Sequence, residues 1–105
     1  MKNINPTSRT LDEKSAASVA ELFRAFSDTS RVRILSAIIK NEMNVSAIAE
    51  AVNISESAVS HHLRSLRQMK IVQARREGKE VFYKVDDEHI VTLFRQGTSH
   101  VQNEW

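Results

Sequence analysis

Two short amphipathic segments separated by a tight turn constrain the fold of this 105-residue chain more than any other feature. The first segment, residues 46–52, has apolar side chains on one helical face: Ile48, Ala49 and Val52. The second, from residue 56 to about residue 69, repeats this pattern with Val59, Leu63 and Leu66. Two short helices joined by a turn at residues 53–55 form a helix-turn-helix arrangement.

The segments before this unit predict two more helices. A helix that begins near residue 15 places four apolar side chains on one face: Val19, Leu22, Phe23 and Phe26. The polar run at residues 27–30 then supplies caps for a second helix. Its inward-facing side chains are Ile34, Leu35, Ile38 and Ile39.

The segments after this unit predict a hairpin and a last helix. Residues 71–76 and 80–85 are typical of two strands, and Gly78 in the turn between them can adopt a positive φ. The last helix begins near Asp87 and ends near residue 102. The predicted order is α-α-α-α-β-β-α: a mainly α winged helix-turn-helix domain with one β-hairpin, over residues 13–105. Residues 1–12, polar and containing Pro6, are expected to form a mobile N-terminal arm.

The composition excludes several classes of protein. A chain of this length holds one domain, and a domain this small often gains stability by pairing with a second copy. The net charge of +2 is too small to indicate a nucleic-acid partner, so the distribution of charge must decide. The absence of cysteine excludes disulfides, thiolate metal ligands and thiol redox sensing. No apolar run approaches the ~18 residues that span a bilayer, and the polar start lacks a secretory core, so we expect a cytoplasmic protein without membrane contact.

The helix after residue 55 has a second face made only of hydrogen-bonding side chains: Ser57, Ser60, His61, Arg64 and Gln68. A helix in a major groove needs such a face, because short hydroxyls allow close approach while His and Arg reach base edges or phosphates. Ser55, as the expected N-cap, leaves the helix N-terminus open to phosphate oxygens. The alternative is a solvated face, which most surface helices have.

The hairpin that follows favours DNA over the solvated face. We expect it to carry three basic side chains at its tip: Arg75, Arg76 and Lys79. An exposed basic hairpin beside a recognition helix can reach backbone phosphates or the minor groove. Together, the polar helical face and the basic hairpin predict binding to double-stranded DNA.

Two segments of the chain resemble the ArsR/SmtB family of bacterial repressors. Residues 55–63 match its recognition-helix pattern SxSxVSxHL, and residues 26–35 are similar to its ALGDxxRxxIL segment, with Phe26 and Ser27 in place of Leu and Gly. The likeness extends from about residue 19 to residue 104. It implies a transcriptional repressor that acts as a homodimer on an inverted-repeat operator, with the first and last helices at the interface.

Two histidines of the last helix, His89 and His100, are eleven residues apart and lie on one helical face. Their separation along the axis is roughly 16 Å, whereas zinc–nitrogen bonds are about 2 Å long, so one straight helix cannot bring both to a single ion. Two antiparallel copies of the helix could do so. Gly97, near the expected crossing, would let the two backbones approach closely.

The resemblance also implies a metal site. Zinc sensors of this family take an Asp-x-His pair from the start of the last helix, and a later His and a ligand three residues on from the other subunit. Asp87, His89 and His100 match three of these positions, which implies zinc, with cobalt or nickel as alternatives. The fourth position falls on Asn103, and Glu104, one residue later, is the first candidate to replace it. Two interface histidines without metal remain an open alternative.

Another metal site and an enzymatic activity are not expected. The family's second metal site uses cysteine and acidic ligands, but Asn44 and Ala47 stand at those positions. No HExxH or nucleophile motif is present, and we expect His62 to be a partly buried packing residue, so the chain is not expected to be an enzyme. The remaining alternative is a repressor of the same family that senses no metal. Such a repressor would answer to a small molecule or a partner protein, or bind DNA constitutively.

Overall fold

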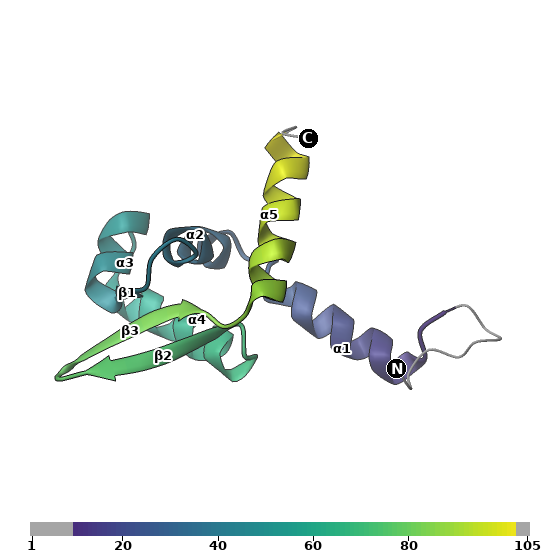
Figure 1. Cartoon of the computed structure of the whole chain (residues 1–105), viewed down its shortest axis with the longest axis horizontal. Coiled ribbons are helices and arrows are strands. Elements are labelled where there is room, and N and C mark those ends of the chain that lie inside the picture. Colours follow the sequence, from purple (N-terminus) through teal and green to yellow (C-terminus); the bar gives the residue numbers. More distant parts are fainter. Residues whose placement is uncertain (1–9, 103–105) are drawn as a thin grey trace.

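Residues 10–102, the part of the chain that a computed structural model describes, form five helices and a three-stranded antiparallel sheet (Figure 1). The elements in chain order are α1 (Glu13–Arg24), α2 (Thr29–Ile38), β1 (Met43–Asn44), α3 (Val45–Val52), α4 (Glu56–Gln68), β2 (Val72–Glu77), β3 (Glu80–Val85) and α5 (Glu88–Gln102). This is the predicted winged helix-turn-helix order with one added strand. The expected N-terminal arm lies almost entirely outside the described residues.

A short polar side chain accepts a backbone N–H at the start of each helix, which explains where the helices begin. The acceptors are Asp12, Asp28, Asn44, Ser55 and Asp87, and each receives the N–H of the residue three positions later, at 2.8–3.1 Å. The caps expected at the start of α2 and at Ser55 are confirmed. These bonds satisfy backbone donors that have no partner inside the helix.

The hydrophobic core lies between α2, α3, α4 and the base of the sheet. Its most deeply buried large side chains are Ile34, Leu35, Ile38, Ile48, Val59, Leu63, Leu66, Ile71 and Val72. The apolar faces predicted for α3 and α4 are therefore confirmed. In α2 the prediction holds for three of four residues, because Ile39 forms the C-cap and is only half-buried.

The turn between α3 and α4 depends on one residue in the left-handed region. Asn53 has φ 58° and ends α3, and the N–H of Ile54 reaches back to the Ala49 carbonyl at 3.3 Å. Asn adopts this conformation more readily than most non-glycine residues. The reversal lets α4 start at Glu56, shortly after α3 ends.

The sheet has the strand order β1-β3-β2, and its first strand was not predicted. β1 contains only two residues, which pair with the middle of β3: Met43 with Tyr83 and Asn44 with Phe82. A strand this short shows no alternation in sequence, so no local pattern indicates it. The predicted hairpin itself is confirmed, with β2 displaced by one residue to Val72–Glu77 and Gly78 at φ +64° in the turn.

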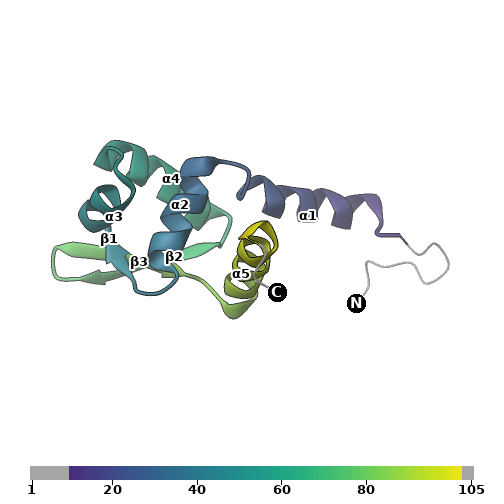
Figure 2. The same cartoon turned by 90° about the horizontal axis from the view of Figure 1, so that it is seen from above.

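Helices α1 and α5 project from the core in two directions (Figures 1 and 2). No residue of α1 is buried, and Ile90 is the buried residue of α5. Leu11, Val19, Phe23 and Val101 are exposed apolar side chains on or next to these helices. Of the apolar face predicted for the first helix, Val19 and Phe23 are exposed, whereas Leu22 and Phe26 are half-buried against the core. None of the helices in residues 10–102 is long and apolar enough to cross a membrane.

Neighbouring residues of α4 provide a test of this packing. Leu63 is 1% exposed in the core, whereas Arg64 is exposed. We expect Leu63→Ala to lower the free energy of unfolding by about 2–5 kcal/mol, because it leaves a cavity. Arg64→Ala should change it by at most about 0.5 kcal/mol. Urea denaturation at one fixed protein concentration measures both, and equal decreases would contradict the packing of α4.

Candidate DNA-binding surface and metal ligands

The polar face of α4 is accessible along its length. Ser57, His61, Arg64 and Gln68 are exposed, and Ser60 is half-buried. The three apolar side chains of the same helix are almost fully buried on the other side. Burial of one face therefore fixes which groups α4 presents outward: hydroxyl, imidazole, guanidinium and amide groups, all able to bond bases or phosphates.

A contact between α2 and α4 also holds the recognition helix. The Arg31 Nε donates to Nδ1 of His62 at 3.2 Å, and His62 Nε2 lies 3.9 Å from Asp28 Oδ2. His62 is partly buried, as predicted. Its bond to Arg31 was not predicted, since no local pattern indicates a contact between residues 31 positions apart.

The hairpin of β2 and β3, which we call the wing, separates its basic residues. Lys79 lies exposed in the turn, and Arg76 lies one residue before the end of β2. Arg75 lies one position further from the turn, opposite Phe82, so its expected position at the tip was wrong. Because side chains alternate along a strand, Arg75 and Arg76 lie on opposite faces of the wing.

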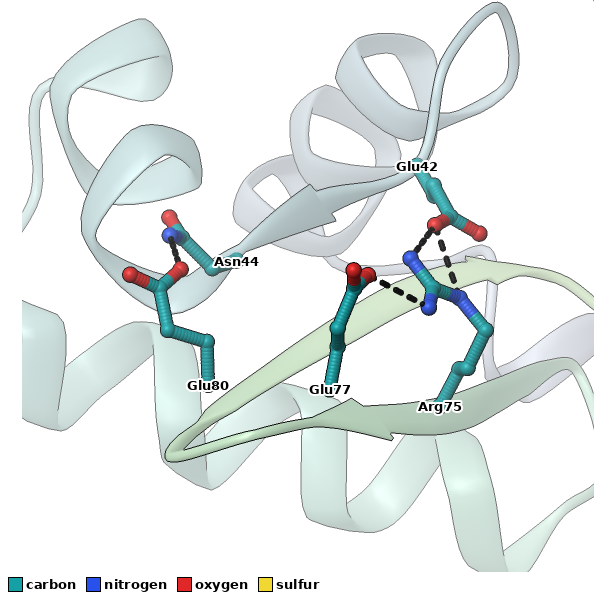
Figure 3. Close-up of polar contacts among 5 residues, drawn as sticks. All are labelled: Glu42, Asn44, Arg75, Glu77 and Glu80. Atoms are coloured by element: carbon teal, nitrogen blue, oxygen red, sulfur yellow. Dashed lines mark hydrogen bonds and ion pairs between the residues drawn. The ribbon is translucent and has the colours of Figure 1, made fainter.

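The Arg75 guanidinium is bound within the protein (Figure 3). Nε donates to the Glu42 carboxylate at 2.9 Å, Nη2 bonds the same oxygen, and Nη1 donates to Glu77 at 2.8 Å. The Phe82 ring lies beneath it, with its centroid 5.1 Å away. Hydrogen bonding to Arg75 lowers the pKa of Glu42 and bonds to both carboxylates raise the pKa of Arg75, so the pair stays ionised at neutral pH.

A second side-chain bond joins the wing to the helix-turn-helix. Asn44 Nδ2 donates to Glu80 at 2.7 Å, while Oδ1 of the same amide caps α3 by accepting the N–H of Ala47 (Figure 3). Asn44 thus links the first residue of β3 to the start of α3. The position of Asn44 was noted from the sequence as that of a missing metal ligand, and its bond to Glu80 was not predicted.

Two of the predicted metal ligands lie together at the start of α5. Asp87 Oδ1 is 3.6 Å from His89 Nδ1, and the His89 side chain is 96% exposed. Two ligand atoms of a tetrahedral zinc ion, each about 2.1 Å from the metal, are roughly 3.4 Å apart. One carboxylate and one imidazole at this distance therefore fit half of a zinc site.

The other predicted ligands do not join them within one protomer. His100 lies eleven residues further along α5, which is one continuous helix, so the two histidines are roughly 16 Å apart along its axis. Within residues 10–102, no group of three or more His, Asp or Glu side chains could hold a metal ion. Asn103 and Glu104 lie outside the described residues.

Between α1, the start of α2 and α5 lies an apolar groove of about 600 Å³. Its lining includes Phe23, Phe26, Leu93, Phe94 and Val101, and Gly97 also lies along it. A Cβ atom added to Gly97 would touch nothing within 4 Å. No contact within the described part of the protomer therefore requires glycine at this position.

A short helix, a tight turn and a second helix beside the wing of a three-stranded sheet define a winged helix-turn-helix protein. The arsR family of bacterial regulatory proteins matches residues 28–74, from the N-cap of α2 into β2. The chain belongs to this ArsR family. It is a DNA-binding transcriptional repressor of the ArsR/SmtB type and not an enzyme, as predicted.

Known relatives extend this likeness over nearly the whole chain. The transcriptional repressor SmtB homolog of Synechocystis is 40% identical over 97% of this chain and 76% of its own length. A cadmium resistance transcriptional regulatory protein CadC homolog of Staphylococcus aureus is 35% identical over 92% and 81%. The homodimeric winged helix-turn-helix DNA-binding domain of a possible ArsR-family regulator from Mycobacterium bovis superposes with a TM-score of 0.80, at 29% identity over 90% of each chain.

Proposed function

We propose that this chain is a cytoplasmic, homodimeric repressor that binds an inverted-repeat operator and releases it when zinc binds between its subunits. The observation that carries the proposal is the pair of opposed faces on α4. One face is locked into the core, and the other presents an unbroken row of hydrogen-bonding groups. A solvated helix does not need that row, but a helix that reads a major groove does.

The groove between α1 and α5 supports a dimer. A protein of this size rarely leaves so many apolar side chains of two helices uncovered, and a second copy is the occupant that buries them on both sides. The Mycobacterium bovis domain is described as homodimeric. Two antiparallel α5 helices would also explain Gly97, because a missing side chain lets backbones approach.

The proposed DNA contacts come from α4 and the end of the wing. Ser57, Ser60, His61, Arg64 and Gln68 would face the major groove, with Ser55 at the helix N-terminus beside a phosphate. Arg76 and Lys79 would bind backbone phosphates. Arg75 is not among the proposed phosphate contacts, because its guanidinium nitrogens are bound to two carboxylates.

Asp87 and His89 of one subunit, with His100 and either Glu104 or Asn103 of the other, are the proposed metal ligands. The 3.6 Å spacing of the first two supports zinc, as does a donor set without thiolates, with cobalt or nickel as alternatives. A bound divalent ion would supply a fixed cross-link between the two α5 helices. The name of the CadC homolog, a cadmium resistance regulator, supports a response to metal.

Substitutions on α4 test the DNA-binding face. We expect His61→Ala and Arg64→Ala each to weaken binding to a duplex selected from a random pool by about 1–3 kcal/mol, because each removes a base or phosphate contact. Lys40→Ala is the matched control, since it removes one exposed charge outside α4. Fluorescence anisotropy of labelled duplex measures affinity, and circular dichroism checks the fold. Unchanged affinity in both α4 variants would refute the assignment.

Zinc and operator should oppose each other. Metal that favours a dimer with poor groove spacing must lower DNA affinity, and DNA must then lower zinc affinity by the same factor. We expect a coupling of about 1–3 kcal/mol, from operator titrations with and without zinc and zinc titrations with and without operator. Equal affinities would mean that any bound metal is structural and that the repressor responds to another signal.

A mixed dimer tests whether each site is shared. One subunit carries His89→Ala and the other His100→Ala, so that one site receives both substitutions and the other keeps both histidines. Each mutant homodimer has two damaged sites and should bind zinc weakly, whereas the mixed dimer should retain one normal site. Equilibrium dialysis gives the stoichiometry. A mixed dimer that binds no better than the homodimers would contradict the shared geometry.

A further inference from the structure

The two faces of the wing differ in charge. Cross-strand neighbours share a face, so Glu77 and Glu80 lie on the same side as Arg75 and Phe82. Glu42, from the loop before β1, adds a third carboxylate there by its bond to Arg75 (Figure 3). Lys84, opposite Gln73, lies on this face too, so the face carries three carboxylates and two cations and is net negative. Arg76 lies on the other face.

The bonds on the acidic face connect the wing to the rest of the domain. Glu42 immediately precedes β1 and holds β2 through Arg75, while Asn44, the second residue of β1, holds β3 through Glu80. The backbone pairing of β1 reaches Phe82 and Tyr83 of β3. The two side-chain bonds add a link to β2 at Arg75, opposite Phe82, and a link to Glu80 beside the turn.

We propose that Arg75 is a positioning residue and that the Glu42–Arg75 ion pair sets the angle of the wing relative to the helix-turn-helix. The backbone pairs of β1 and the Asn44–Glu80 bond attach the domain to β3, whereas Glu42–Arg75 attaches it to β2. Losing this pair removes a restraint on β2 and widens the range of orientations that the wing samples. A wing held in place has given up that freedom before DNA arrives, which lowers the entropic cost of binding. This inference rests on the proposed contact between wing and DNA.

Opposite charge changes separate this role from simple electrostatics. Glu42→Gln makes the protein more positive and Arg75→Gln makes it more negative, yet both break the ion pair. We expect both variants to weaken binding to a mixed-sequence duplex by about 3- to 10-fold. The double variant should be no weaker than either single one, because the same pair is already broken. Glu50→Gln is the control: the Glu50 side chain is exposed and makes no hydrogen bond or ion pair among residues 10–102, so its replacement changes only net charge.

The salt dependence of binding separates positioning from phosphate binding. Removing one cation that binds a phosphate should reduce the slope of log affinity against log salt by about 0.9. We expect Lys79→Gln to reduce the slope and Arg75→Gln to leave it unchanged.

Wing motion is measured independently: the chain has no cysteine, so Lys79→Cys gives one site for a fluorescent label at the turn. Added Glu42→Gln or Arg75→Gln should lower the residual anisotropy of that label, whereas added Glu50→Gln should not.

Three results would overturn the inference: Glu42→Gln tightening binding as Glu50→Gln does, Arg75→Gln reducing the salt slope as Lys79→Gln does, or an unchanged label anisotropy. Failure of the proposed function looks different. If neither Arg76→Gln nor Lys79→Gln alters affinity or slope, the wing does not contact DNA, and the anisotropy of the label still decides whether the ion pair holds the wing.

Discussion

The burial of one face of α4 is the constraint on which the rest of the molecule depends. Val59, Leu63 and Leu66 are almost completely shielded from water, so the rotation of the helix about its axis is fixed. Turning it would expose these side chains and bury Arg64 or His61 without partners, and both changes are unfavourable. The proposed DNA-reading surface is thereby held in place by the core of a small domain.

The same small core explains the dimer that we propose. Helices α2 to α4 and the sheet bury most of the core side chains, whereas α1 and α5 retain exposed apolar side chains beside a groove. A second copy would complete the fold at that groove. It would also bring the C-terminal end of the second copy's α5 towards Asp87 and His89, so one interface would serve both stability and metal binding.

Local patterns in the sequence predicted the elements that local chemistry determines. Caps such as Asp28 and Ser55 and the apolar spacing of α4 indicated the helices and their faces. Contacts between distant residues were beyond reach: β1 has two residues and no period, and the pairs Arg31–His62 and Glu42–Arg75 each join positions more than 30 residues apart. The acidic face of the wing was missed for the same reason, since Arg75 looks like any basic hairpin residue until its partners are known. Three of the five predicted metal-ligand candidates lie in the described chain, and only two of these meet within a protomer.

The junction between the wing and α5 brings the two proposed functions close together. The metal-ligand candidate Asp87 follows the end of β3 by two residues. Asp86 between them is tied to the start of β2: its N–H bonds the Ile71 carbonyl at 2.9 Å, and Gln73 donates to its backbone and side-chain oxygens at 3.2 and 2.9 Å. A change in the direction of α5 would therefore act on the base of the wing through a few covalent and hydrogen bonds. An effect of metal on DNA binding needs no long chain of contacts through the core, provided that the wing moves as the rigid unit that the Glu42–Arg75 ion pair would make of it.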